Sequence, residues 1–355
     1  MNANIQKFQA LLEHDRQALL LSGNPNRLYG TGSSVDESLA VVYHDGLSFF
    51  TDSRYIEAAQ KDMPDFDVQM TDREHTPISL LRAVLEAKGI TQLGIEEDVM
   101  SVAEYKKLEA ELDVELFFAQ DKLNSCRNAK EAWELERMEQ AQAITDAVFT
   151  HMCGFVKAGM TEKEVEAELI AALYRGGSDG LAFPPIVVAG PNSSMPHGVA
   201  GSRVIREGDF LTMDFGAKYQ GYCSDMTRTV AIGYATDKMK EVYDTVLRAQ
   251  LAGIAVTKAG VCGCEVDSAA RQVITEAGYG SFFGHGYGHS LGIQIHESPN
   301  CNPGGKTPLP VGAVCSAEPG IYLPGEFGVR IEDVVVVTAD GCKNITKSPK
   351  ELIIL

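Results

Sequence analysis

Hydrophobic positions in the first third of the chain follow two different periods. Short apolar or β-branched runs predict strands, and apolar residues recurring at three or four positions predict helices. Strands are expected at 17–22, 39–43, 47–51, 66–70, 92–96 and 114–118, and helices at 54–61, 77–88 and 103–112. The second and third strands form a hairpin across His44, Asp45 and Gly46. This order is typical of an α/β layer domain, and the region carries no chemical motif of its own.

Longer helical patterns follow a polar segment, residues 119–128, which is predicted to be a linker. We place the domain boundary between residues 122 and 123. Helices are expected at 130–157, 162–174, 238–258 and 265–277, with strands interleaved between and after them. The mixture indicates an α+β domain that ends in strand-rich sequence.

One hairpin-like run, residues 208–233, sets two carboxylates into otherwise strand-like sequence. If its turn is centred between Tyr219 and Gln220, Asp214 and Asp225 are direct antiparallel partners with Cβ atoms about 5 Å apart. Like charges so placed repel each other unless a cation lies between them. The pattern therefore predicts that these two carboxylates face each other and hold a divalent metal.

Three histidines follow within twelve residues: His285, His289 and His296. The glycines around them (284, 286, 288 and 292) argue against a helix, so His285 and His289 are not a helical metal-binding pair. Glycine instead allows the backbone to approach a site closely. We expect these histidines on strands and loops around a site.

Acidic residues near the end of the chain complete a candidate ligand set. Glu318 lies after an apolar run and just before a Pro-Gly turn. In the last β-branched strand, alternation puts Arg330 and Glu332 on one face and Asp333 on the other. Two Asp, two Glu and at least one His form a mostly oxygen ligand set. Such a set suits Mn, Mg, Fe, Co or a pair of Zn ions better than a sulfur-rich structural zinc site does.

These motifs in this order (Asp-x10-Asp, His-Gly-x-Gly-His, Glu-Pro-Gly-x-Tyr and Arg-x-Glu-Asp) resemble the pita-bread metallopeptidases. That family includes methionine aminopeptidase, aminopeptidase P and prolidase (Xaa-Pro dipeptidase). No single motif is specific, but the combination is, and the similarity covers most of residues 124–355. The resemblance implies a creatinase/prolidase-like α/β N-terminal domain over 1–122. It also implies an α+β pita-bread catalytic domain with a curved antiparallel sheet over 123–355.

The resemblance also implies two divalent metals held by five residues. Asp214 and Asp225 would bind one metal bidentately and bridge to the other, His289 would complete the first site, and Glu318 and Glu332 would complete the pair. Manganese is the expected metal, with cobalt, zinc and iron as alternatives, because all tolerate this ligand set.

Further roles follow from the same matches. Glu318 would take and return a proton, His296 would support the tetrahedral intermediate, and His197 would lie beside the scissile bond. Ser290 stands where many relatives have Gly, which removes no ligand.

Three more matches, His285, Tyr322 and Arg330, would line or brace the substrate pocket. Two alternatives stay open for them. His285 and Tyr322 could be packing residues, and Arg330 could simply pair with a nearby carboxylate, including a ligand.

The implied activity is attack of a metal-bridging hydroxide on the carbonyl that precedes a proline nitrogen. Methionine aminopeptidases generally lack the N-terminal domain, whereas the Pro-specific relatives use it to dimerise and to limit peptide length. We therefore expect an Xaa-Pro dipeptidase or an Xaa-Pro aminopeptidase. The rivals are a creatinase-like C–N hydrolase, a non-catalytic peptide-binding module and a two-metal phosphoesterase, although the chain lacks a basic phosphate-gripping loop.

Composition and charge limit the partners and the cellular location that can be expected for the protein. The formal net charge of −18 argues against nucleic-acid binding. The sequence has neither a signal-peptide pattern nor an apolar run of 18 residues, so no membrane partner is expected. The eight cysteines are scattered and are expected to be reduced thiols, which makes a Cys–His nucleophilic enzyme a poor interpretation. These features predict a cytoplasmic protein, and the resemblance implies a homodimer that acts on short proline-containing peptides.

Overall fold

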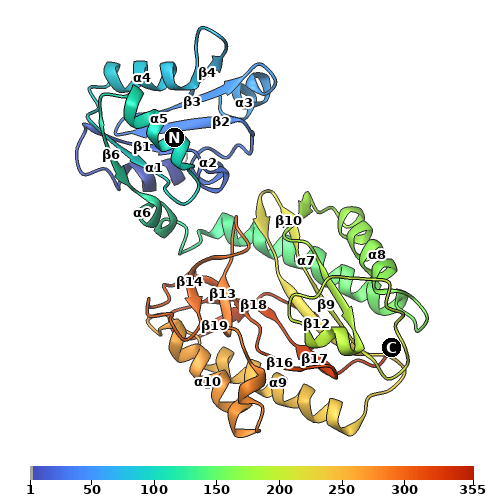
Figure 1. Ribbon diagram of the computed structural model, residues 1–355. Coiled ribbons are helices and arrows are strands. Elements are labelled where there is room, and N and C mark those ends of the chain that lie inside the picture. Colours follow the sequence, from blue (N-terminus) through green and yellow to red (C-terminus); the bar gives the residue numbers. More distant parts are fainter. Residues whose placement is uncertain (1–2) are drawn as a thin grey trace. The chain divides into compact units, whose positions relative to one another are not determined.

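The computed structural model describes residues 3–355 of the chain (Figure 1). These residues form two compact units, one ending at Arg127 and the other beginning at Asn128. Each unit has its own hydrophobic core and is described by itself.

The first unit is built on one six-stranded sheet with strand order β4-β3-β2-β1-β5-β6 (Figure 1). The strands are β1 Gln17–Leu21, β2 Ser38–Tyr43, β3 Gly46–Asp52, β4 Asp67–Thr71, β5 Gln92–Ile95 and β6 Glu115–Phe118. The predicted hairpin is confirmed, because β2 and β3 pair antiparallel. Strand β1 pairs parallel with β5. Helices α4 Pro77–Ala87 and α5 Val102–Glu111 bury leucines against apolar side chains of the sheet. The expected α/β layer architecture is confirmed.

Three helices of this unit were not predicted: α1 Ala3–Gln9, α2 Asn24–Thr31 and α6 Gln120–Ser125. Helix α3 Ile56–Asp62, by contrast, agrees with prediction. Helix α2 contains Pro25 and Gly30, which are poor helix formers. Tertiary contacts override that propensity, because the Asn26 amide donates to the buried Glu96 carboxylate at 2.6 Å and Gly30 packs closely on Phe8. Helix α6 occupies most of the segment that was predicted to be a linker, and the expected boundary at 122/123 lies within it.

The second unit is α+β, and its paired strands are all antiparallel among the residues described. Its main helices are α7 Ala132–Phe155, α8 Glu162–Arg175, α9 Asp237–Val256 and α10 Gly263–Glu276. They agree with the predicted helices except for a few residues at their ends. Helices α7 and α8 pack on one apolar cluster and α9 and α10 on another (Figure 1). The expected antiparallel pita-bread architecture is confirmed.

The strands of this unit form several small sheets. A three-stranded sheet has the order β12-β9-β8, from Met226–Ala231, Phe210–Phe215 and Ile186–Ala189. A five-stranded sheet has the order β14-β13-β15-β18-β19, from Glu297–Cys301, Gly288–Ser290, Val314–Ala317, Asp333–Val337 and Cys342–Asn344. The remaining strands are β7 Gly180–Leu181, β10 Ala217–Tyr219, β11 Tyr222–Cys223, β16 Gly320–Leu323 and β17 Phe327–Arg330, with 3-10 turns η1 Gly190–Ser194 and η2 Gly280–Phe282.

The register of the acidic hairpin differs from the prediction by two residues. Tyr219 pairs with Tyr222, and Asp214 pairs with Thr227 rather than with Asp225. The turn is therefore centred on Gln220 and Gly221, whose φ angles are 47° and 84°. Two positive φ values define the tight hairpin turn that matches strand twist, and Gly221 takes its second position without strain.

The prediction that Asp214 and Asp225 face each other directly is therefore wrong. A shift of two residues nevertheless preserves the side of the sheet, because side chains alternate with a period of two. Both carboxylates line one cavity of the second unit. They are diagonal neighbours rather than direct partners.

The strand register on either side places Gly216 opposite Asp225. A Cβ atom on Gly216 would lie 1.9 Å from the backbone oxygen of Ser224. Only glycine fits there without moving the strand that carries Asp225. The two backbones therefore approach closely at the residue that directly precedes Asp225.

We predict that Gly216→Ala lowers the free energy of unfolding by about 3 kcal/mol, because the added methyl group overpacks a backbone contact. Urea unfolding of the full chain measures the effect. Gly180→Ala in the neighbouring strand β7 is the matched control, since a Cβ there meets nothing within 4 Å. Equal stabilities for the two variants would contradict this account of the hairpin.

Candidate metal centre

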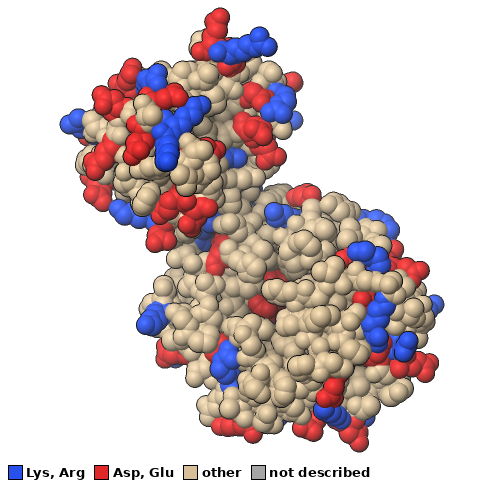
Figure 2. All heavy atoms as spheres, viewed as in Figure 1, with Lys and Arg blue, Asp and Glu red and all other residues tan. Residues whose placement is uncertain are grey.

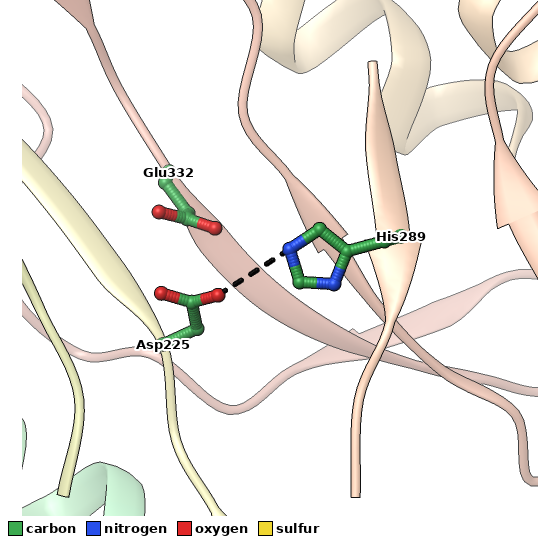
Figure 3. A group of neighbouring side chains, drawn as sticks. All are labelled: Asp225, His289 and Glu332. Atoms are coloured by element: carbon green, nitrogen blue, oxygen red, sulfur yellow. Dashed lines mark ion pairs between the residues drawn. The ribbon is translucent and has the colours of Figure 1, made fainter. Parts of the chain in front are cut away.

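Asp225, His289 and Glu332 form a compact group in the second unit (Figure 3). One potential ligand atom from each lies within 4.8 Å of the other two. Asp225 immediately precedes β12, His289 is the middle residue of β13, and Glu332 lies in the short link between β17 and β18. In Figure 3 the three side chains point toward one another, and the Asp225 Oδ2 atom is 3.5 Å from His289 Nε2.

The other two predicted ligands lie beside this group. Glu318 Oε1 is 3.2 Å from His289 Nε2 and accepts a hydrogen bond from the Ser316 hydroxyl at 3.0 Å. Asp214 lines the same cavity, which has a volume of about 550 Å³. The structure thus brings all five predicted ligands together. In Figure 2 acidic side chains are visible in a hollow of this unit, surrounded by uncharged surface.

Two carboxylate oxygens in the cluster lack hydrogen-bond partners. Asp214 Oδ1 and Glu332 Oε1 are buried, and no described group bonds to either of them. A buried polar atom without a partner is costly, and an uncompensated buried charge is more so. Buried oxygens that converge on one space, beside a histidine, are the donor set of a hard divalent cation. The residues therefore fit the metals that the sequence predicted.

Burial and mutual repulsion change how these acids ionise. Burial is the largest cause that raises the pKa of Asp225, and the charges of Glu332, Asp214 and Glu318 raise it further. The pKa of Glu332 is raised well above its usual value by the same two effects. Without a cation, these carboxylates retain protons at a pH where ordinary acids have lost them.

His289 and Glu318 behave as an ion pair. Burial alone would lower the pKa of His289, but its hydrogen bond to Glu318 and the acidic surroundings raise it to about 9. For Glu318, burial favours the neutral acid, yet the bond to His289 and the nearby positive charge lower its pKa to about 2. A metal ion would take the place of the proton on His289, because only the neutral imidazole can act as a ligand.

Arg330 is tied directly to the cluster. Its guanidinium donates to Asp214 Oδ2 at 2.6 Å, to the Tyr322 hydroxyl at 2.9 Å and to Thr227 Oγ1 at 2.9 Å. Thr227 in turn donates to Glu332 Oε2 at 2.8 Å. Arg330 therefore pairs with a nearby carboxylate, as one of the two alternatives expected, and it also lines the cavity.

Thr227 is a site residue that the sequence reasoning missed. Its hydroxyl joins Arg330 to Glu332 and is fully buried. The signal was present in the alternation of the strand, since Thr227 is two residues after Asp225 and so shares its face. Thr227 holds Glu332 directly and Asp214 through Arg330, so two of the predicted ligand carboxylates have fixed orientations.

His285 and Tyr322 form a hydrogen-bonded pair beside Arg330. The His285 Nδ1 atom is 2.8 Å from the Gly286 carbonyl oxygen, which makes Nδ1 the donor and leaves Nε2 to accept from the Tyr322 hydroxyl at 2.9 Å. Burial lowers the pKa of His285 and raises that of Tyr322 to about 12, so both side chains are neutral near pH 7. His285 lines the cavity, while Tyr322 braces His285 and Arg330.

The two remaining histidines lie at the same cavity. The His296 ring is 4.4 Å from the His289 ring between centroids. Burial and the nearby His289 charge lower the pKa of His296, which favours its neutral form. His197 is exposed on the loop that follows η1 and lines the cavity.

The loop with His197 is closed by a buried carboxylate that sequence reasoning also missed. Glu162, the first residue of α8, accepts hydrogen bonds from the Ala189 amide at 2.7 Å, the Asn192 side chain at 3.0 Å and the Gly201 amide at 3.0 Å. These donors lie on both sides of His197 in sequence. Glu162 therefore fixes the base of the loop.

The cavity, its acidic cluster and the antiparallel fold around it define a metallopeptidase. The chain belongs to metallopeptidase family M24, whose model matches residues 136–339. The creatinase/prolidase N-terminal domain matches residues 5–129. This membership makes the protein a hydrolase and implies divalent metal ions as its cofactor.

Individual relatives resemble nearly the whole chain. An uncharacterized peptidase, YqhT of Bacillus subtilis, is 41% identical over 338 residues and covers 95% of each chain. The solved structure of an Xaa-Pro dipeptidase from Bacillus anthracis is 38% identical, with a TM-score of 0.95 over 99% of each chain. That of an X-Pro aminopeptidase from Thermotoga maritima is 35% identical, with a TM-score of 0.91 over 96% of this chain and 97% of that one.

In the part of the chain that the structure describes, the helices are too short or too polar to span a bilayer.

The pKa shifts predict how pH affects the metal-free protein. Asp225, Glu332 and His289 hold protons more tightly when folded than when unfolded, so their stabilising effect is present at low pH and is lost as pH rises. For His289 the loss falls between pH 6.5 and about 9. We expect the Tm of the chelated protein to fall by several degrees across this range, as measured by calorimetry.

A divalent metal should reverse this trend, because its ligands must be deprotonated to bind. In saturating Mn²⁺ the Tm should therefore rise relative to the chelated sample, and the difference should grow from pH 6.5 to pH 9. A metal-independent Tm, or a metal effect that shrinks with rising pH, would count against the assigned cluster.

Proposed function

We propose that this chain hydrolyses the peptide bond between an N-terminal residue and proline, as an Xaa-Pro dipeptidase or an Xaa-Pro aminopeptidase. The observation that supports it best is the convergence of five ligand-type residues with His197 and His296 in one cavity. Relatives that resemble nearly the whole chain carry both of these names. Since the relatives are peptidases, a peptide substrate is implied.

We assign the metal ligands as Asp214, Asp225, His289, Glu318 and Glu332, holding two divalent ions. Manganese is the first expectation, with cobalt, zinc and iron as alternatives. When bound, such ions polarise a carbonyl group and lower the pKa of water, so that a nucleophile is available at neutral pH. The orphaned oxygens of Asp214 and Glu332 support this assignment.

Glu318 is the proposed general base. Its carboxylate is held by Ser316 and lies at the edge of the cluster next to His289. A carboxylate in this position would be within reach of a metal-bound water and could accept its proton as the water attacks. The same carboxyl group would then pass that proton to the leaving proline nitrogen.

Two histidines are proposed to contact the substrate. His296, kept neutral by burial, can donate an N–H to the oxyanion that develops on the scissile carbonyl. His197 projects from its loop at the edge of the cavity and would bond to the substrate backbone. His285, Tyr322 and Arg330 would brace the ligands from behind.

The wall of the cavity suits a proline ring. Phe183, Pro184, Pro185, Ile186 and Ile295 provide apolar lining beside the acidic cluster. A bond to proline has no N–H, so recognition of the ring requires shape and apolar contact rather than a hydrogen-bond acceptor. This supports proline after the scissile bond over residues with longer polar side chains.

The first test is Glu318→Gln, which removes the proposed base while keeping the shape of the side chain. We expect kcat to fall by about 100-fold to 10,000-fold in a metal-replete assay, with little change in the far-ultraviolet CD spectrum. Glu326→Gln is the control, because Glu326 is an exposed carboxylate that pairs with Lys238. Metal content is measured in parallel. If Glu318→Gln turns over substrate about as fast as wild type, Glu318 is not the general base.

The second test compares substrates. Hydrolysis of an Xaa-Pro dipeptide and an Xaa-Pro-Xaa tripeptide, with Mn²⁺, with Co²⁺ and after chelation, separates dipeptidase from aminopeptidase action. We expect metal-dependent cleavage of at least one, and at least about tenfold slower cleavage when alanine replaces proline. A reconstituted protein that binds no metal would revive a creatinase-like or non-catalytic role. Cleavage of phosphate esters with peptides spared would indicate a phosphoesterase.

A homodimer and a cytoplasmic location stay predictions from the sequence and the resemblance.

A further inference from the structure

A buried ion pair lies outside the metal cluster and next to His296 in sequence. The Lys130 ammonium is 3.0 Å from Glu297 Oε2, and the two side chains are only 1% and 3% exposed. The residues are 167 positions apart. The proposed reaction uses neither of them.

Glu297 holds the loop that carries His296, residues 291–296. Its second oxygen accepts a hydrogen bond from the Gln294 amide at 3.2 Å. A Cβ atom on Gly292 would lie 2.7 Å from Glu297 Oε2 and 2.9 Å from the Lys130 side chain. The ion pair therefore packs directly on the loop backbone, and glycine at 292 makes this possible.

The other contacts of the loop connect it to the cluster. The Cys223 amide donates to the Gly292 carbonyl at 2.7 Å, and Cys223 is two residues before Asp225. The Leu291 amide donates to the Val314 carbonyl at 3.1 Å on strand β15. The loop is thus attached at its start, while Glu297 secures its end.

Lys130 is itself fixed by the backbone. Its amide donates to the Gly312 carbonyl at 2.9 Å, two residues before helix α7 begins. Gly312 has a φ of 84°, and a Cβ atom there would lie 3.0 Å from the Lys130 carbonyl oxygen. The ammonium group therefore projects from a rigid junction between α7 and the segment before β15.

Stability alone does not account for such a pair. Removing charges from water costs about as much as their attraction returns, so an apolar pair of similar size often stabilises a fold equally well. Unlike an apolar pair, an ion pair also fixes the positions of its two charged groups, here the Lys130 ammonium and the Glu297 carboxylate. Glu297 is the first residue of β14, and the adjacent His296 ring lies 4.4 Å from the His289 ring.

We propose that Lys130 and Glu297 are positioning residues that fix loop 291–296 so that His296 faces the metal cluster. The inference rests on the proposed role of His296 in the reaction. In this proposal Lys130, near the start of the second unit, fixes the orientation of His296, although the two residues are far apart in sequence.

The kinetic test combines variants with His296→Ala. We expect Lys130→Met and Glu297→Gln each to lower kcat by about 100-fold, with KM within about threefold and bound metal unchanged, because small displacements of a catalytic group have effects of this size. Adding His296→Ala to Glu297→Gln should lower kcat by less than about threefold further, since the histidine is already misplaced. Multiplicative losses would overturn the proposal.

Asp146→Asn is the matched control. Asp146 also receives backbone N–H groups, from Lys347 and Ser348, and it does not line the cavity. In that background His296→Ala should have its full effect. The double variant Lys130→Met/Glu297→Leu separates folding from positioning. Its Tm should be close to that of wild type while its kcat stays low, and recovery of kcat together with Tm would assign the pair to stability alone.

A second readout does not depend on activity. In full-length protein labelled with 15N in its histidine rings, the His296 signals are assigned by their loss in His296→Gln. They should shift or broaden in Glu297→Gln and in Lys130→Met/Glu297→Leu, while those of the exposed His151 stay in place. Unmoved His296 signals would overturn the proposal. If wild type cleaves no Xaa-Pro peptide, the proposed function fails, and these signals still decide whether the pair positions His296.

Discussion

Repulsion among buried carboxylates is the constraint on which the second unit depends. Asp214, Asp225, Glu318 and Glu332 converge in one cavity, and two of their oxygens have no hydrogen-bond partner among the described residues. The chain balances part of this charge with Arg330 and His289, which pair with Asp214 and Glu318. We propose that a divalent cation balances the remainder. Without a cation, such a group of buried carboxylates is energetically unfavourable. The same unbalanced negative charge gives the site its attraction for a metal ion.

The surrounding structure keeps that unfavourable arrangement in place. Thr227 joins Arg330 to Glu332, Glu162 closes the loop of His197, and the pair of Lys130 and Glu297 secures the loop of His296. These side chains lie on, or directly beside, helices and strands that pack on two apolar clusters. The packed elements hold the polar groups in place despite the repulsion among the carboxylates.

Much of the fold could be predicted because its signals are local. Alternating and 3.6-residue patterns located the main strands and helices, and the order of motifs identified the family and the ligand candidates. Helix α2 was missed because its weak local propensity is overcome by Glu96, a residue 70 positions away from Asn26. The hairpin register was wrong by two residues because a turn at Gln220 and Gly221 depends on backbone angles that a single glycine barely signals. Thr227, Glu162 and Lys130 were missed because their partners are remote in sequence, and a lone threonine, glutamate or lysine has no distinctive pattern.

The spacing of the ligands along the chain has a consequence for folding. Asp214 and Glu332, two of the proposed ligands, are separated by more than half of the second unit, and β12, β13 and β15 lie between them in sequence. Because most of the site arises from contacts that are distant in sequence, a partly folded form of this unit cannot assemble the full set of proposed ligands. We therefore expect metal capture to be a late event in the folding of this unit. In a cell, this order would keep a half-folded chain from becoming an active hydrolase.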